Sequence, residues 1–294
     1  MILVTGGLGM IGAHTARALL DLGRDVVVTS HRRSSVPSFL DGEVAVEALD
    51  VTDRDAFLAL GERYDVTDIV HLAGSIPDDP VAYFRHDMTG LFNALDAARS
   101  WGGRRFAVAS SLGVYAGQAE TPWHEGLPLS TVDLPHLIVA FKKSVEPITT
   151  HALQGSGVHP LILRIGSTWG PLMDPETPFN YLPPYINAVL RGETPDALHA
   201  DDGGDWCYAP DAGRAIALLV TAGTLDHTTY NVSSGSPMRN QQLAEALDVP
   251  CKPGGQPGPH LDITRLTEAT GFTPHYTVPE AVAHYINWRT TNPR

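Results

Sequence analysis

The first 23 residues carry the feature that most limits what this chain can fold into. The apolar run "ILVTGG" (2–7) predicts a buried strand, and "MIGAHTARALLDLG" (10–23) has helical spacing and a glycine stop. Gly6, Gly9 and Gly12 stand between them in the spacing G-x-x-G-x-x-G. Glycine allows a tight turn and the close approach of a pyrophosphate, and the helix start offers unpaired N–H groups. The segment therefore predicts a dinucleotide-binding turn.

The first half of the chain continues this alternation of strands and helices. Further strands are expected at 25–30, 44–53, 68–74, 106–111 and 159–167, with helical segments at 54–63 and 88–100. Apolar strands separated by amphipathic helices predict a parallel sheet that is covered on both faces. With right-handed crossovers this is an α/β fold, a Rossmann-type doubly wound parallel sheet. Residues 1–170 are expected to form an NAD(P)-binding Rossmann domain.

The second half is richer in proline and glycine. It still has helical spacing near 181–191, 210–221, 240–247 and 278–289. We expect residues 171–294 to form mainly a smaller C-terminal substrate-binding lobe, with some segments returning to the Rossmann sheet. Ligands of open parallel sheets bind at the carboxyl ends of the strands, so a small-molecule substrate is expected in the cleft between the lobes.

Charge and composition exclude several other classes. The formal charge of −13 makes nucleic acid and anionic membranes poor partners. No apolar run approaches the ~18 residues of a membrane span, and "MILVTGG" enters a strand without a basic leader. Cys207 and Cys251 form no disulfide framework. We therefore expect a cytoplasmic protein without a signal peptide, a membrane span or a metal site.

The end of the second strand favours NADP over NAD. An NAD site usually places an acidic side chain there, whereas this chain has Ser30, followed by Arg32, Arg33 and Ser34. A guanidinium matches a 2′-phosphate in charge and geometry. A solvated basic turn is the alternative. Asp50, after the third strand, is placed either to accept a hydrogen bond from the adenine amino group or to cap the next helix, as Asp53 is expected to do.

Motifs along nearly the whole chain resemble one family. "TGGLGMIG", "LDVTD", "VHLAG", "ASSLGVYAG", "LRIGSTWGP", "DWCYAPDAGRA", "YNVSSG" and "TGFTP" occur in the order of the extended short-chain dehydrogenase/reductase family, also called the NAD-dependent epimerase/dehydratase family. "RRSS" resembles the NADP-binding turn of its GDP-mannose dehydratase members. The resemblance implies a Rossmann lobe, a substrate lobe, bound NAD(P) and a homodimer formed through two helices of each subunit. It also implies carbonyl reduction, alcohol oxidation, epimerisation or dehydration.

The resemblance also implies the site residues. The hydroxyl position of the family's Ser/Thr, Tyr and Lys set matches Ser111, after Ser110, and the lysine matches Lys142 because Glu146 follows four residues later. Lys143 is the off-register alternative. The expected cofactor contacts are Gly6, Gly9, Met10, Ile11, Gly12, Ser30, Arg32, Arg33, Ser34, Asp50, Val51, Leu72, Ala73, Gly74, Lys142 and Ile165.

The catalytic tyrosine of this pattern is missing. Ile138 and Val139 stand four residues before the two lysines, and neither side chain has a proton to give. His136 and Tyr208 are the first candidates to replace it as proton donors. The alternative role of His136 is to cap the helix, and that of Tyr208 is to pack in the core of the substrate lobe. His124 and Glu125 are weaker loop candidates.

Two further departures concern the helix and the substrate. Pro147 either kinks the helix that contains Lys142 or marks the first turn of a new helix. Gly204 stands where sugar-nucleotide members often have a phosphate-binding arginine, with Arg191 and Arg239 as possible substitutes. This favours an uncharged or aromatic substrate over a nucleotide sugar.

Three functions remain open. The first hypothesis is an NADP-dependent oxidoreductase acting on a small-molecule carbonyl or alcohol with a non-standard proton donor. The alternative is a redox-neutral epimerase, dehydratase, lyase or cyclase on the same scaffold. The third is a non-catalytic, NADP-sensing binding protein.

Overall fold

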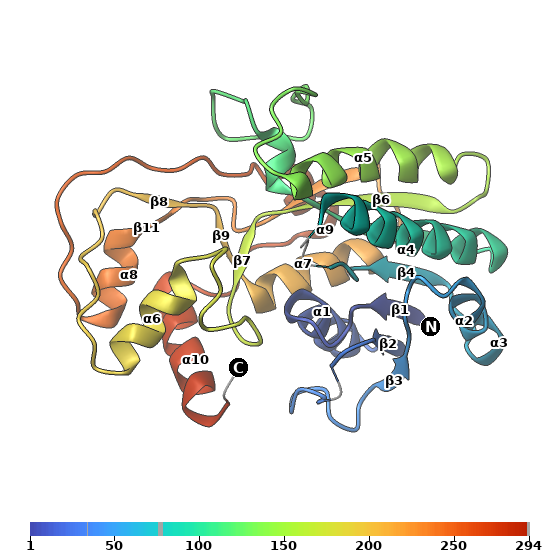
Figure 1. Ribbon diagram of the computed structural model, residues 1–294, viewed down its shortest axis with the longest axis horizontal. Coiled ribbons are helices and arrows are strands. Elements are labelled where there is room, and N and C mark those ends of the chain that lie inside the picture. The colour runs from blue at the N-terminus through green and yellow to red at the C-terminus, as the bar shows by residue number, and fades with distance from the viewer. Residues whose placement is uncertain (34, 76–78, 293–294) are drawn as a thin grey trace.

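The computed structural model describes residues 1–33, 35–75 and 79–292, and within them a parallel sheet of seven strands forms the centre of the molecule (Figure 1). The strands lie in the order β10-β6-β5-β4-β1-β2-β3. They are β1 (Ile2–Thr5), β2 (Val26–Ser30), β3 (Ala45–Ala48), β4 (Asp68–His71), β5 (Arg105–Ser111), β6 (His159–Ile165) and β10 (Thr229–Val232). The strand order reverses between β1 and β4, which is where open α/β sheets bind their ligands. The predicted Rossmann-type sheet is confirmed.

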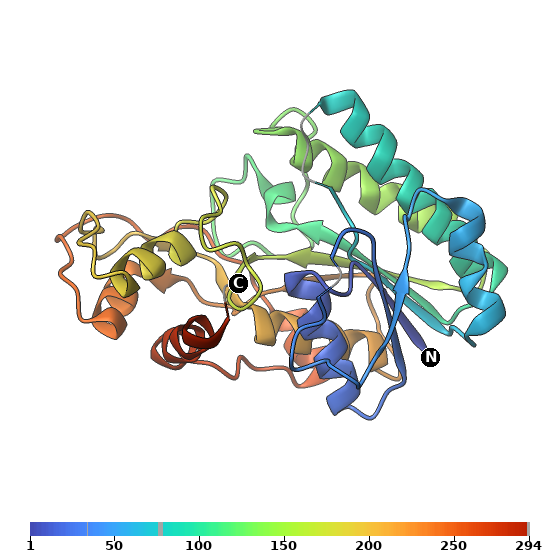
Figure 2. The same ribbon diagram turned by 60° about the horizontal axis from the view of Figure 1, so that its bottom comes forward.

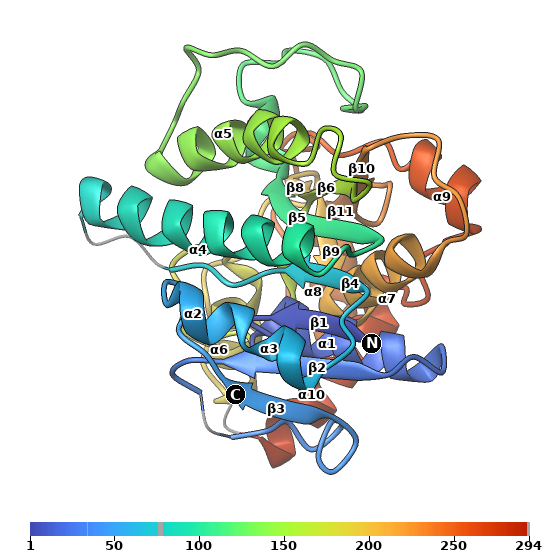
Figure 3. The same ribbon diagram turned by 90° about the vertical axis from the view of Figure 1, so that its right-hand side faces the viewer.

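Helices cover both faces of the sheet, as Figure 3 shows. One layer consists of α1 (Met10–Asp21), α7 (Ala209–Thr221) and α9 (Thr264–Thr270), and the other of α2 (Arg54–Leu58), α3 (Leu60–Arg63), α4 (Pro80–Ser100) and α5 (Leu137–Ala152). In β1, Ile2 and Val4 pack into the core under the first layer, and Leu3 packs into the core under the second. Both strand faces are therefore buried, which explains the unbroken apolar run in the sequence.

The second half of the chain contributes to both parts of the molecule. Strand β10 pairs in parallel with β6, and α7 packs on α1, where a side chain at Gly213 would lie 2.4 Å from the backbone of His14. The other segments form a smaller lobe beside the carboxyl ends of the strands (Figure 2). It contains α6 (Leu182–Leu190), α8 (Asn240–Leu247), α10 (Val278–Thr291) and the short strands β7 (Ser167–Trp169), β8 (Gly203–Gly204), β9 (Trp206–Tyr208) and β11 (Met238–Arg239).

Helix α5 runs without interruption through Pro147, which lies on its exposed side. His136 is the residue just before the helix, with an extended backbone, and its side chain forms no capping hydrogen bond. The helix therefore does not restart at Pro147. The expected helix at 54–63 differs, because it is divided into α2 and α3 at Ala59.

No helix among the residues that the structure describes is both long enough and apolar enough to cross a membrane.

Candidate active site

A cleft of about 280 Å³ opens at the carboxyl ends of β1, β2 and β4. We call it the nucleotide cleft. It is lined by Gly6, Leu8, Gly9, Thr29, Ser30, His31, Arg32, Arg33, Leu49, Val51, Leu72, Ala73, Gly74, Ser75 and His86. Nine predicted cofactor contacts are among them, whereas Met10, Ile11, Gly12, Asp50, Lys142 and Ile165 are not. Ser34 lies outside the described residues.

The glycine turn fits a pyrophosphate. Gly6 has a φ of +66°, and a side chain there would lie 3.0 Å from the backbone of Ala73. A side chain at Gly12 would lie 2.3 Å from the carbonyl oxygen of Gly6. Helix α1 begins at Met10 without a side-chain cap, so the amides of its first turn are available to an anion. Only glycine allows the strand, turn and helix to approach this closely.

The basic turn lies along the same cleft. The Ser30 hydroxyl donates to the carbonyl oxygen of Arg33 at 2.6 Å, and the Arg33 guanidinium donates to the carbonyl oxygen of Leu8 at 3.1 Å. The side chains of Arg32 and Arg33 are exposed. His31, which the sequence analysis did not single out, also lines the cleft, and its Nε2 lies 3.8 Å from a carboxylate oxygen of Asp50.

Asp50 is held by a turn of its own. Its carboxylate accepts hydrogen bonds from the backbone N–H of Thr52 at 2.9 Å and from the Thr52 hydroxyl at 2.7 Å. These bonds lower the pKa of Asp50. The cap of α2 is Asp53, whose carboxylate accepts from the N–H of Ala56 at 3.0 Å.

Ser111 and Ile165 are the last residues of the neighbouring strands β5 and β6, and Lys142 of α5 reaches β5 two residues before Ser111. Ser111 is the last residue of β5 and pairs with Ile165 in the sheet register, and its hydroxyl accepts from the N–H of Gly113 at 3.1 Å. The Lys142 ammonium donates to the carbonyl oxygen of Ala109 at 2.7 Å. Burial lowers the pKa of Lys142 to about 8, opposed by the negative charge of Asp87. Lys143 points elsewhere and donates to the carbonyl oxygens of Ser130 and Asp133.

Ile138 is partly buried and packs into the core between α5 and the sheet. Val139 is almost fully buried, at 1% exposure. His136 is exposed at the start of α5. Neither the position of the missing tyrosine nor His136 therefore adds a buried polar side chain beside Lys142 and Ser111.

The other candidate proton donors have partners of their own. The Tyr208 hydroxyl lies 2.6 Å from Nδ1 of His284, and the side chain is buried among the aromatic residues of the small lobe. Burial raises the pKa of Tyr208 far above its usual range. Nδ1 of His124 accepts from the N–H of Gly126, and the buried Glu125 accepts from the N–H of Asn231 at 2.8 Å.

A buried polar network lies beneath this edge and was missed in the sequence. The Glu146 carboxylate pairs with the Arg164 guanidinium through two hydrogen bonds, of 3.0 and 2.8 Å, and accepts a third from Ser110 at 2.6 Å. Arg164 also donates to the hydroxyl of Tyr115, which donates to Asn231. Burial acts to lower the pKa of Arg164, but its bonds to Glu146 raise it overall. The sequence held one sign of this network, because an arginine inside the apolar run "LILRIG" (161–166) needs a buried partner.

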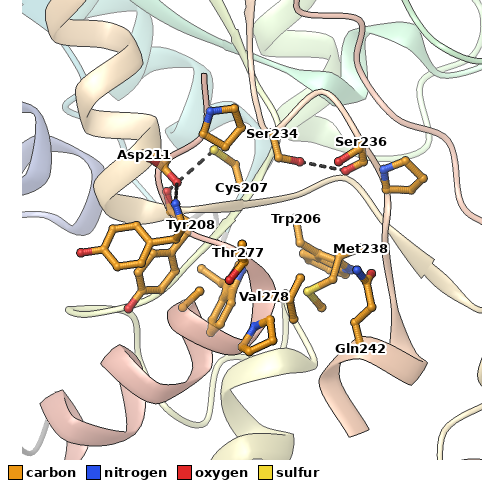
Figure 4. A pocket seen from close by; sticks show the side chains of 16 residues that line it. Trp206, Cys207, Tyr208, Asp211, Ser234, Ser236, Met238, Gln242, Thr277 and Val278 are labelled. Atoms are coloured by element: carbon orange, nitrogen blue, oxygen red, sulfur yellow. Dashed lines mark hydrogen bonds between the residues drawn. The ribbon is translucent and has the colours of Figure 1, made fainter. Parts of the chain in front are cut away.

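The small lobe has a cavity of its own, of about 260 Å³, shown in Figure 4. We call it the small-lobe pocket. Its walls are mainly aromatic and apolar, with Trp169, Trp206, Tyr208, Met238, Tyr276 and Val278 among them. Asp211 closes one end and accepts hydrogen bonds from the backbone N–H groups of His275 and Tyr276, at 2.8 and 3.1 Å.

The doubly wound sheet, the glycine turn and the nucleotide cleft define a Rossmann-type protein with an NAD(P) site. The model of the NAD dependent epimerase/dehydratase family matches residues 2–233. The chain therefore belongs to this family of enzymes, as its motifs predicted.

Similarity extends over whole relatives. UDP-glucose 4-epimerase of Erwinia amylovora is 26% identical, over 100% of this chain and 98% of the relative. The structure of the Thermus thermophilus UDP-glucose 4-epimerase in complex with NAD is 25% identical, with a TM-score of 0.77 and 99% of both chains covered. UDP-N-acetylglucosamine 4-epimerase from Methanobrevibacter ruminantium M1, in complex with UDP-N-acetylmuramic acid, has a TM-score of 0.83 at 22% identity, covering 99% of this chain and 98% of that one.

Proposed function

We propose that this protein is a redox-neutral epimerase or dehydratase that uses NAD(P) during turnover. The observation that carries the proposal is that Lys142 binds β5 at the carbonyl oxygen of Ala109, two residues before Ser111 at the end of that strand. Strand β5 lies beside β4 of the nucleotide cleft in the sheet. The relatives from Erwinia amylovora and Thermus thermophilus support it, since both carry the name UDP-glucose 4-epimerase. This is the alternative of the sequence analysis, now preferred over net carbonyl reduction.

The protein's own residues supply binding and proton transfer. The bound cofactor supplies hydride chemistry, so the chain has to move a proton at the substrate oxygen. The Ser111 hydroxyl orients that oxygen, and Lys142 gives and takes the proton. An ammonium group whose pKa is about 8 suits both directions near neutral pH, because general acid–base catalysis works best when pKa and pH are close. The lost tyrosine at Ile138 costs about 10²–10⁴-fold of such help. We assign no proton transfer to His136 or Tyr208.

We infer that NADP is preferred over NAD. The support is that Ser30 stands where an NAD site would have a carboxylate, and that the exposed guanidinium groups of Arg32 and Arg33 lie beside it on the cleft wall. The relative from Thermus thermophilus binds NAD, so the preference rests on this turn alone.

The substrate is a small molecule that we place between the two lobes. Gly204 pairs with Met238 in the small lobe and offers no cation, and Arg191 is already bound to Glu193 and Glu176. These facts support an uncharged or aromatic substrate, whereas the names of the relatives support a sugar nucleotide. A panel containing both classes decides between them.

A turnover assay tests the proposal. The purified protein, with NAD⁺ or NADP⁺, is incubated with UDP-sugars, dTDP-sugars and uncharged polyols, while products are followed by NMR and the cofactor by absorbance at 340 nm. We expect a product of inverted configuration or of water loss, without net accumulation of reduced cofactor. Lys142→Ala abolishes it, and Lys143→Ala serves as the matched control. No product from any substrate contradicts the proposal.

A second candidate is the NADP-dependent oxidoreductase with an altered proton donor. The basic turn favours it, because it suits the cofactor of most reductive reactions. Stoichiometric oxidation of NADPH by a carbonyl substrate would identify it. Ile138→Tyr restores the missing acid, and a gain of reductase activity in this variant would show that only the acid was lost.

We further propose a cytoplasmic homodimer. The two free cysteines support the location, and exposed apolar side chains on α4, Val81 and Phe92, support pairing through this helix. Analytical ultracentrifugation of the wild type and of Phe92→Glu tests the dimer.

A further inference from the structure

Helix α4 carries a buried carboxylate to which no role has yet been assigned. The Asp87 side chain is only 5% exposed. It accepts hydrogen bonds from the N–H of Ser75 at 3.2 Å, from the Ser75 hydroxyl at 2.7 Å and from Nδ1 of His86 at 2.8 Å. A side chain at Gly74 would lie 3.5 Å from its Oδ2. Asp87 therefore lies directly behind the wall of the nucleotide cleft, which Gly74, Ser75 and His86 line.

The sheet brings this carboxylate close to Lys142. Strands β4 and β5 are neighbours, with His71 opposite Val108. The Lys142 ammonium is bound to the carbonyl oxygen of the next residue of β5, and Asp87 is bound to Ser75, four residues beyond His71. Both groups therefore lie at the same edge of the sheet.

Helix packing brings the two groups together from the other side. Tyr83 lies one turn before Asp87 on α4, and its ring meets the ring of Phe141, the neighbour of Lys142, at 5.4 Å edge to face. Burial lowers the pKa of His71 to about 4, and the Lys142 charge also acts to lower it while Asp87 opposes the shift. His71 therefore lies close enough to both charged groups for each of them to act on its pKa.

The elements packed around Lys142 carry several titratable or charged groups. They are Tyr83, His86 and Asp87 on α4, His71 on β4, Glu146 on α5 and Arg164 on β6. Glu146 is committed to Arg164 by two hydrogen bonds. Burial and the nearby Asp87 raise the pKa of Tyr83, so this hydroxyl stays neutral. Asp87 is then the carboxylate that is left to balance a buried ammonium.

We propose that Asp87 is a positioning residue, whose buried charge keeps Lys142 in the ammonium form at neutral pH. Without a nearby negative charge, a desolvated lysine loses its proton, because burial disfavours the charged form. A neutral Lys142 has no proton to donate to a substrate oxygen. The catalytic importance of this pairing between Asp87 and Lys142 rests on the proposed function, in which Lys142 transfers the proton. The pairing itself can be measured without any substrate.

The composition of the chain makes the measurement simple, because Lys142, Lys143 and Lys252 are its three lysines. Protein grown with lysine ¹³C-labelled at Cε is titrated by NMR without cofactor, and Lys142→Arg assigns the Lys142 signal. We expect Asp87→Asn to lower the titration midpoint of Lys142 by about one pH unit, the usual size for the loss of a nearby opposite charge. The other two lysines should not shift.

The matched control is Asp96→Asn. Asp96 lies on the same helix but is half exposed and paired with Arg54, so its removal should leave Lys142 unchanged. An unchanged Lys142 midpoint in a folded Asp87→Asn protein overturns the proposal. A change in folding alone would not move one lysine signal selectively.

A second pair of variants covers the case in which Asp87→Asn does not fold. Asp87→Glu keeps the negative charge on α4, so the Lys142 midpoint should stay close to that of the wild type, whereas Asp87→Ser removes the charge and should lower the midpoint. An unchanged Lys142 midpoint in the Asp87→Ser protein overturns the proposal. A protein that shows the coupling but converts no substrate contradicts the proposed function and leaves the pairing intact.

Discussion

The nucleotide cleft and the small-lobe pocket are nearly equal in volume, at about 280 and 260 Å³, but they are built in different ways. The cleft is lined by the turns that follow β1, β2, β3 and β4, together with one residue of α4. The small-lobe pocket is lined by residues of β7, of β9 and of the start of α7, and by the segments 234–242 and 274–281. The cleft is therefore assembled from consecutive motifs, and the pocket from segments far apart in the sequence.

This difference explains why one site could be predicted and the other could not. Strand-end turns carry glycines and charges whose roles follow from local geometry. An aromatic wall forms only when distant segments pack, and its residues look like an ordinary core until then. The following predictions test whether the two regions are as independent as this comparison implies.

The largest expected effect is in the small lobe. Trp169 is 1% exposed and contacts Tyr208 and Tyr285, with ring centroids 4.9 and 5.9 Å apart. Trp169→Ala should lower the free energy of unfolding by about 3–5 kcal/mol, the usual cost of removing a buried aromatic side chain. Urea denaturation measures it, with the exposed Phe179→Ala as control. The cofactor affinity of the folded protein should not change. A clear loss of cofactor affinity would show that the small-lobe pocket and the nucleotide cleft are not independent.

Acid should weaken both regions through one buried histidine each. Burial lowers the pKa of His14, beside the small lobe, and of His71, below the cleft, from 6.5 to about 4. The unfolded chain then binds more protons below pH 6.5, so stability is full above that pH and is lost as pH falls toward 4. The loss is up to about 3 kcal/mol for each histidine. His14→Gln and His71→Gln should each flatten the measured dependence of the unfolding free energy on pH. An unaltered slope in either variant would show that the replaced histidine does not cause the loss of stability in acid.

Gly12→Ala should act on the cleft alone. The new Cβ would lie 2.3 Å from the carbonyl oxygen of Gly6, and a backbone atom cannot move aside cheaply. Overpacking of this kind costs about 2 kcal/mol, or a factor of about 30 in cofactor affinity if the turn absorbs it. Fluorescence titration with NADPH measures the loss. Gly223→Ala is the control, since nothing lies within 4 Å of its added Cβ.

The smallest expected effect concerns the basic turn of the nucleotide cleft and tests which cofactor the cleft prefers. Arg33→Ser should weaken NADPH binding about tenfold, the scale of one charge-assisted hydrogen bond, and leave NADH binding nearly unchanged. Arg24→Ser, also exposed but not lining the cleft, is the control. Equal losses for both cofactors would show that Arg33 supports the turn through Leu8 and does not read the 2′-phosphate.

Much of the fold followed from local pattern. The six strands expected in the first half are present, although β3 and β4 end earlier than predicted. Strand β10 was not expected as a strand, since "TYNV" is only four residues long, and it pairs in parallel with β6. Helix 54–63 was predicted as one element, yet Ala59 divides it.

The candidate site also contains residues that local motifs predicted and residues that only the structure revealed. Lys142 and Ser111 were expected from the family's motifs and stay predictions as site residues, and the structure adds the contacts of their neighbours. The Glu146–Arg164 pair joins α5 to the strand that follows it, and it forms only when the helix packs on the sheet. The burial of Asp87 depends on which face of α4 is turned to the core. Charged residues at such positions read as surface residues until their partners are known.

The sequence by itself determined the doubly wound sheet, the glycine turn, the basic turn beside it and the absence of a tyrosine at Ile138. Each of these is a local property, set by residue type and spacing within one strand, turn or helix. Only the tertiary structure decided that Lys142 and not Lys143 faces β5, that Tyr208 belongs to the small-lobe core, and that a buried carboxylate lies near the lysine. Burial and electrostatic pairing are properties of packing, and a sequence does not specify packing until the chain has folded.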